Sequence, residues 1–222
     1  MNKLAAAILV FGALSVATAA DLSEYRTFQF GMDLSTVARQ AGMNPSEAKV
    51  IHSRPALMQE LAWRPKPLGA SADTEPVKEV VFSFYNGELY RIAASYDRYE
   101  TEGMTADDLT EAISATYGIS TKPAAPAGIL PPSYGDQEKV LAQWQDSQYG
   151  FNLVQASYGP EFKLVGVLKR LVEPVQSANI EAARLDNKEA PQREAERLTK
   201  ENDTERLRLE QARLVNKPKF RP

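Results

Sequence analysis

Polar and hydrophobic residues alternate most regularly between residues 77 and 96. Two alternating runs, 77–85 and 88–96, flank the dipeptide Asn86-Gly87. This dipeptide favours a two-residue type I′ turn, because both of its positions need a positive φ. The pattern predicts a β-hairpin with side chains at period two on one face. The predicted face consists of Val80, Phe82 and Phe84 on the first strand and Tyr90, Ile92 and Ala94 on the second.

Two other segments place apolar residues at the helical spacing of three and four. The first begins after Asp33 and ends at Gly42. Asp33 is the predicted N-cap, because its short side chain accepts hydrogen bonds from the free N–H groups of the first turn. The second helix begins after Thr105 and ends at Gly118. Thr105 and Asp108, three residues apart, form a pair like a capping box.

Further strand-like runs surround these elements. They are predicted at 25–30, 49–53, 57–63, 140–145, 151–158 and 162–171. Residues 65–76 and 119–138 hold many of the prolines and glycines and are predicted loops. The sequence therefore predicts an α+β fold, with an antiparallel sheet or sheets and helices packed on one face. Each helix leads into an antiparallel meander, so the globular domain 21–175 has the candidate halves 21–102 and 103–175.

The composition changes at residue 176. Between 176 and 216 charged residues dominate and aromatic residues are absent. The leucines are too sparse for a sustained heptad, and Pro191 either interrupts a continuous helix or starts a second one. Residues 176–222 are therefore predicted to form a charged helical or partly disordered C-terminal arm. We expect its deletion to leave the melting temperature nearly unchanged.

The first 20 residues have the pattern of an export signal. Lys3 precedes an apolar run from Leu4 to Val16, and Ala17-Thr18-Ala19 fits the A-x-A cleavage rule. The run is shorter than the roughly 20 residues of a membrane-spanning helix, which argues against a transmembrane anchor. We therefore expect cleavage near Ala19 or Ala20 and a periplasmic or secreted product without a transmembrane span.

The composition also narrows the partners and the chemistry. A net charge of -3 argues against nucleic acid as a partner, because phosphate binding needs a basic surface. The chain has no cysteine, which excludes a thiol nucleophile, a thiolate metal site and a cysteine-linked lipid anchor. It also lacks a phosphate-binding glycine loop, a G-x-S-x-G elbow and an S-x-x-K motif. We therefore expect no cofactor and no metal.

Few residues are candidates for catalysis. His52 is the only histidine, so a Ser-His-Asp triad or a histidine zinc site would have to use it. A lone histidine in a short strand is more often structural. Asp107 and Asp108 lie in the predicted first turn of the second helix, where the helix dipole favours acids. The acidic stretch 97–102 does not have EF-hand spacing. No catalytic residue is therefore assigned.

Aromatic residues on the strands are better candidates for a binding surface, because exposed Trp and Tyr often dominate protein-binding patches. The candidate surface comprises Trp63, Tyr85, Tyr90, Tyr96, Trp144 and Tyr149. We expect an exported, non-catalytic protein-interaction module whose partners are envelope proteins. Two alternatives stay open. One is a carboxylate-dependent glycan hydrolase, with two carboxyl groups in a cleft; the other is a small-ligand carrier with an internal apolar pocket.

Several short motifs resemble a known architecture of exported bacterial proteins. Gly31-Met32 before a short helix, Trp63 at a strand end and the turn sequence 84–89 resemble the repeat of SmpA/OmlA (small outer-membrane assembly lipoprotein) and of the beta-lactamase-inhibitor protein. The segment 103–109 resembles the same helix opening. The resemblance covers about residues 25–118 and implies a non-catalytic binding module built from helix-plus-meander repeats. The chain departs from the assembly lipoproteins because it has no cysteine for a lipid.

Overall fold

The computed structural model describes residues 21–65, 75–122, 139–155, 161–219 and 221. The predicted signal segment, most of both predicted loops and the predicted strand end at 156–158 lie outside the described residues. The described strands are β1 (Glu24–Tyr25), β2 (Phe28–Gln29), β3 (Lys49–His52), β4 (Met58–Trp63), β5 (Val77–Tyr85), β6 (Glu88–Tyr96), β7 (Lys139–Gln145), β8 (Tyr149–Gln155) and β9 (Phe162–Leu168). The helices are α1 (Leu34–Gln40), α2 (Ala106–Tyr117) and α3 (Lys169–Asn216), with 3-10 turns η1 (Pro45–Glu47) and η2 (Lys217–Lys219).

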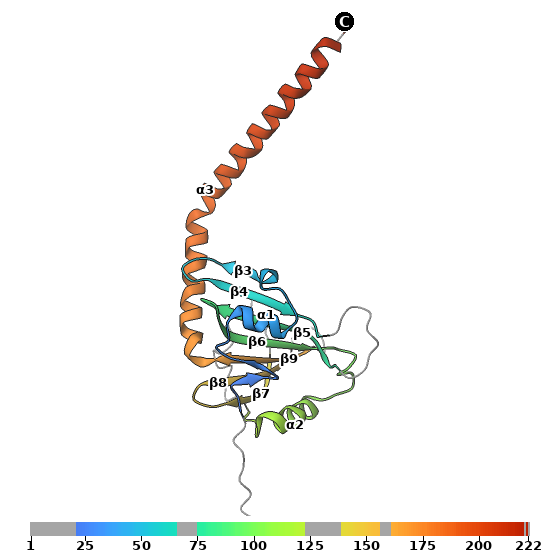
Figure 1. The fold of residues 1–222 in the computed structure, drawn as a ribbon, viewed down its shortest axis with the longest axis vertical. Coiled ribbons are helices and arrows are strands. Elements are labelled where there is room, and N and C mark those ends of the chain that lie inside the picture. Colours follow the sequence, from blue (N-terminus) through green and yellow to red (C-terminus); the bar gives the residue numbers. More distant parts are fainter. Residues whose placement is uncertain (1–20, 66–74, 123–138, 156–160, 220, 222) are drawn as a thin grey trace, which may run out of the picture.

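The main sheet has seven strands in the order β3-β4-β5-β6-β9-β8-β7, and all neighbours are antiparallel. β1 and β2 form a separate two-stranded sheet. The two meanders, β3 to β6 and β7 to β9, join through β6 and β9 at the middle of the main sheet (Figure 1). This architecture confirms the predicted α+β fold with an antiparallel sheet.

The hairpin of β5 and β6 has the predicted boundaries. Asn86 and Gly87 adopt φ values of 50° and 84°, as the type I′ turn requires. One detail of its face differs from the prediction, because a register shift follows Ser83. Leu89 then lies opposite Phe84, and Tyr90 becomes the extra residue of a β-bulge. Leu89 therefore takes the core position that the simple alternation gave to Tyr90.

Both predicted N-caps are confirmed. The Asp33 carboxylate accepts a hydrogen bond from the Thr36 N–H at 3.0 Å. Thr105 and Asp108 form a reciprocal capping box, in which each side chain accepts from the other residue's backbone N–H. Gly118 ends α2 with a φ of 79°, a conformation that glycine adopts without strain.

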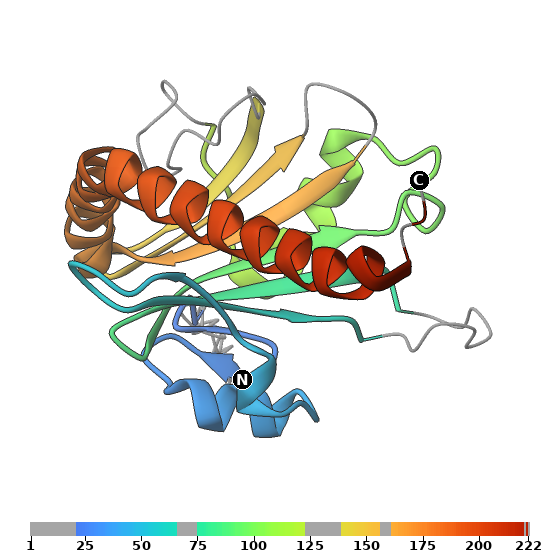
Figure 2. The same cartoon turned by 90° about the horizontal axis from the view of Figure 1, so that it is seen from above.

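One face of the main sheet carries the main hydrophobic core. Phe82 and Phe151 point to this face and pack in one cluster with Val37 of α1 and Leu109 of α2. The alternate strand positions form a smaller cluster of Ala93, Val154, Val165 and Val167, against which Val172 of α3 packs. Leu171, Val175 and Ala178 of α3 belong to the main cluster, so the first turns of α3, at one end of the sheet in Figure 2, contribute to both clusters.

Helix α3 starts earlier than predicted, and it continues past Pro191, where an interruption was considered. It begins at Lys169, directly after β9, so residues 169–171 are helical and not the end of a strand. It then continues through Pro191 as one helix that bends and projects far beyond the sheet (Figure 1). The packed part also extends past residue 176, because Ala178 and Ala182 are buried. The arm that projects into solvent therefore begins near residue 190.

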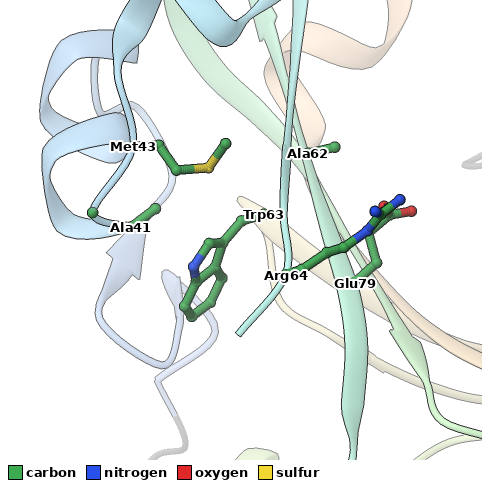
Figure 3. Close-up of a pocket in the computed structure, with 7 residues that line it drawn as sticks. Ala41, Met43, Ala62, Trp63, Arg64 and Glu79 are labelled. Carbon is green, nitrogen blue, oxygen red and sulfur yellow. The ribbon is translucent and has the colours of Figure 1, made fainter. Parts of the chain in front are cut away.

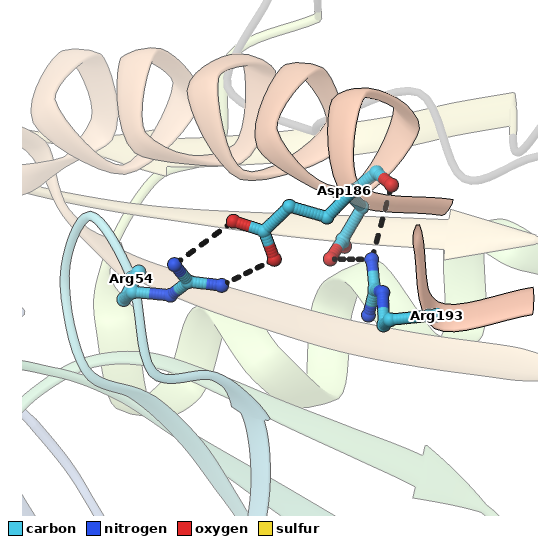
Figure 4. A network of polar contacts seen from close by, with 4 residues as sticks. Arg54, Asp186 and Arg193 are labelled. Carbon is cyan, nitrogen blue, oxygen red and sulfur yellow. Dashed lines mark hydrogen bonds and ion pairs between the residues drawn. The ribbon is translucent and has the colours of Figure 1, made fainter. Parts of the chain in front are cut away.

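A polar network marks the place where the arm leaves the body. The Arg54 guanidinium donates two hydrogen bonds to the Glu189 carboxylate, at 3.0 and 2.7 Å (Figure 4). This contact lowers the pKa of Glu189. Arg193 donates to the backbone oxygen of Asp186 at 3.0 Å and to its carboxylate at 2.9 Å. Because Pro191 has no N–H to donate within the helix, these side-chain contacts support the helix where a backbone hydrogen bond is missing.

The rest of the arm is a charged helix that also exposes a few large apolar side chains. Arg197 pairs with Glu194 and Glu201, and Arg208 pairs with Glu205, at spacings of three or four residues. Such pairs stabilise an exposed helix that packs on nothing. None of the helices among the described residues has an apolar stretch long enough to span a bilayer.

Candidate binding site

A pocket of about 460 Å³ opens beside the end of β4. It is lined by Ala41, Gly42, Met43, Ala62, Trp63, Arg64 and Glu79. The first three of these residues follow α1, the next three lie at the end of β4, and the last belongs to β5. Three segments that are distant in the sequence therefore build the site.

The pocket reaches both sides of strand β4. Figure 3 shows Trp63 and Met43 on one side of the strand and Ala62, Arg64 and Glu79 on the other. Successive residues of a strand point to opposite faces of its sheet. A pocket lined by Ala62, Trp63 and Arg64 together must therefore lie at the edge of the strand, where the main chain itself is accessible.

Trp63 forms a fixed wall of the pocket. Its ring meets Phe28 edge-on, with ring centroids 5.3 Å apart, and stacks on Phe82 at 6.3 Å. Both phenylalanines are buried, so the core holds the indole in place. The opposite wall is Met43, whose backbone N–H donates to the Ala38 oxygen at 2.8 Å. A rigid aromatic surface thus faces a flexible thioether, a combination that adapts to different apolar groups.

An ion pair forms the polar rim of the pocket. Arg64 approaches a Glu79 carboxylate oxygen with two guanidinium nitrogens, each at 3.0 Å. The Arg64 side chain is 67% exposed, whereas that of Glu79 is 29% exposed. The rim therefore presents guanidinium N–H groups to solvent next to an apolar slot.

The structure does not bring the six candidate aromatic residues together on one surface. Trp63 lines the pocket, whereas Tyr149 stacks on Phe30 with centroids 5.7 Å apart. Tyr85 and Tyr90 are half-buried and pack at the border of the main core.

Tyr96 lies at the other end of the hairpin. Burial raises its pKa strongly, and the nearby Tyr25 phenol raises it further. The prediction for Trp144 needs correction, because its side chain is in the core and only 1% exposed. Its indole N–H donates to the Gly118 oxygen at 3.0 Å and to the Ser114 hydroxyl at 3.2 Å, so it holds the end of α2 against β7.

Two of the acidic residues considered for catalysis have structural partners. Asp108 caps α2, and hydrogen bonds from the Thr105 backbone and hydroxyl lower its pKa. Asp97 accepts a hydrogen bond from the Tyr99 N–H at 2.8 Å. His52 is half-buried on the edge strand β3. Over the described ranges, no group of three or more His, Asp or Glu side chains could hold a metal ion.

Sequence reasoning identified Trp63 but not the other residues of the pocket. Ala41 lies at the end of the first predicted helix and Met43 in the turn after it. No local signal in the sequence connects either residue with β4. The opposite charges of Arg64 and Glu79 are a usable signal only when the register of β4 and β5 is known. No protein family, curated protein or solved structure matches this chain.

Proposed function

We propose that this protein is an exported, non-catalytic interaction module of the bacterial envelope, and that it binds a partner protein at the pocket beside β4. Export rests on the N-terminal sequence pattern. The observation that carries the binding function is the pocket itself, in which the ring of Trp63, held by the core, faces Met43 across an open slot with a charged rim. Aromatic anchors with a polar rim are typical of protein-binding sites.

The pocket supports binding better than glycan hydrolysis. Hydrolysis of a glycosidic bond generally uses two carboxyl groups on either side of the bond. Among the described residues that line this pocket, Glu79 is the single acid, and it is paired with Arg64. An open pocket at a strand edge also differs from the internal apolar cavity of a small-ligand carrier.

The projecting arm gives the module a second element. From residue 190 to its end at Asn216, the projecting part of α3 spans roughly 40 Å at about 1.5 Å per residue. Its balanced ion pairs keep it helical without a partner, and its leucines at 198, 207, 209 and 214 are more than 40% exposed. We propose that the arm holds the body at a distance from a second partner.

Site-specific photo-crosslinking tests the proposed function. p-Benzoylphenylalanine at position 64, which lines the pocket, is compared with the same amino acid at position 119, where the isoleucine is 96% exposed and does not line the pocket. In cells of the native host, position 64 should give a defined adduct that position 119 does not give. Absence of any adduct specific to position 64, or release of sugars from envelope glycans by the purified protein, would contradict the proposal.

A further inference from the structure

The edge of β4 is only half covered by its outer neighbour. On one side, β4 pairs with β5 along the whole length of β4, from Met58 to Trp63. β3 has four residues and pairs only with Met58, Gln59 and Glu60. Among the described residues, no strand pairs with the rest of that edge. The sheet therefore has a step beyond the start of β3, and the pocket lies at this step.

The hydrogen bonds of Leu57 show which backbone groups face the step. Its oxygen accepts from the Asn86 N–H at 2.8 Å, and its own N–H donates to the Asn86 side chain at 3.0 Å, so its polar groups point toward the β5–β6 turn. In an antiparallel ladder, the N–H and C=O of one residue point the same way, and the direction alternates along the strand. Leu61 and Trp63 therefore pair with β5, while Ala62 directs its N–H and C=O toward the open edge.

Ala62 thus offers a donor and an acceptor side by side, beside an apolar slot. No backbone or side-chain group of the described residues is hydrogen-bonded to these two atoms. An extended polypeptide chain supplies the matching acceptor and donor at the spacing of a strand, and its alternate side chains point to the two sides. The slot between Met43 and Trp63 lies on one of those sides, as Figure 3 shows.

We infer that the open edge of β4 accepts an extended segment of a partner protein as an added strand, in line with β3. The segment pairs its main chain with Ala62 and inserts one large apolar side chain between Met43 and Trp63. This inference rests on the proposed function and specifies its binding mode. Main-chain pairing provides affinity, and the slot selects for an apolar residue at one position.

Ala62→Pro tests the main-chain pairing directly. Proline removes the N–H that faces the open edge, and edge strands tolerate proline where that group faces solvent. Ala62→Ser is the matched control, because it changes the side chain but keeps the N–H. Met43→Gln makes the slot polar at similar volume, and Val50→Ser removes an exposed apolar side chain of β3 outside the pocket. Circular dichroism melts establish that each variant is folded.

The probe is a library of random linear twelve-residue peptides displayed on phage and selected against the chain from residue 21. We expect selected peptides to share one large apolar residue. Binding, measured by fluorescence anisotropy, should weaken at least about tenfold in Ala62→Pro and in Met43→Gln. It should stay within about twofold of wild type in Ala62→Ser and Val50→Ser.

Three results would overturn the inference. Selected peptides that bind all variants equally would show that binding occurs elsewhere, which removes the edge mode but leaves the binding function intact. A selection that enriches no peptide would also remove the edge mode, and the crosslinking at position 64 would then decide the proposed function separately. Wild-type protein that dimerises, with dimers lost in Ala62→Pro, would make a second copy the occupant in place of a foreign segment.

Discussion

Replacing Gly166 by alanine should destabilise the fold, although glycine is usually a poor strand residue. Gly166 lies on β9 opposite Phe151 of β8 and Ile92 of β6. A Cβ atom at this position would lie 2.4 Å from Cε1 of Phe151 and 2.9 Å from two more of its ring atoms. These distances are far below van der Waals contact, so either the ring or the strand must move.

The Phe151 ring has little room to move. It is fully buried and stacks on Tyr117, with centroids 4.5 Å apart. Tyr117 is in turn held by a hydrogen bond from its hydroxyl to the Glu24 oxygen. Overpacking of a core costs about 1–3 kcal/mol in free energy of unfolding. Because Tyr117 holds the Phe151 ring from the other side, we expect a cost near the upper value. Alanine also lowers the conformational entropy of the unfolded chain, which stabilises the folded state by about 0.4–1 kcal/mol and offsets part of this cost. We therefore expect a net loss of about 2 kcal/mol.

Urea denaturation, monitored by tryptophan fluorescence, measures this loss of unfolding free energy. For a domain of this size, about 2 kcal/mol corresponds to a fall in Tm of roughly 4–8 °C. Gly150→Ala is the matched control, because the nearest atom to its new Cβ would be Cε of the Lys169 side chain at 3.4 Å, not a buried ring. It should change stability by less than about 0.5 kcal/mol.

A double-mutant cycle identifies the cause. Phe151→Leu removes the ring atoms that the new methyl group would meet, so Gly166→Ala should cost much less in that background. A coupling energy of at least about 1 kcal/mol is expected. If Gly166→Ala were as stable as wild type, or equally costly with and without the Phe151 ring, the steric reasoning would be refuted.

Three further predictions concern the arm and the contacts of α2, each measured by thermal or urea unfolding. Deleting residues 192–222 should change Tm by less than about 2 °C. Deleting residues 176–222 should lower Tm by about 4–8 °C, because it exposes packed surface worth at least about 2 kcal/mol. The burial of Ala178 and Ala182 thus overturns the expectation from the sequence that this longer deletion leaves Tm nearly unchanged. Trp144→Phe should cost about 1–2 kcal/mol, since it leaves the Gly118 oxygen without its indole donor. Thr105→Ala should cost about 1 kcal/mol through loss of the α2 N-cap, and an unchanged midpoint would contradict the capping role.

Features that depend on a few neighbouring residues could be predicted from the sequence. The turn at Asn86-Gly87 and the cap at Thr105 follow from local backbone preferences, and the structure places both as predicted. The bulge at Tyr90 could not be predicted, because it depends on how Leu89 meets Phe84 across the strands. A shift of one residue changes which side chains face the core.

The length of α3 shows that helix ends, too, depend on contacts that local sequence signals do not contain. Pro191 is a local signal for a helix end, but the Arg193 contacts with Asp186 support the helix at that point. Arg54, far away in the sequence, adds a tertiary contact at Glu189. The burial of Trp144 was unpredictable for a related reason, since alternation along β7 does not tell which face α2 covers.

The pocket beside β4 was the least predictable feature, because it lies where the short strand β3 leaves part of β4 unpaired. β3 begins with Lys49, is short and has a register shift before His52, all of which discourage the pairing of an edge strand with another chain. Beyond β3, the same edge continues at Ala62, where the side chain is small and uncharged. Selection against aggregation alone would favour protection along the whole edge. The contrast between the protected β3 and the open Ala62 is therefore the reason to place a partner strand at the step, even though β3 exposes more apolar surface.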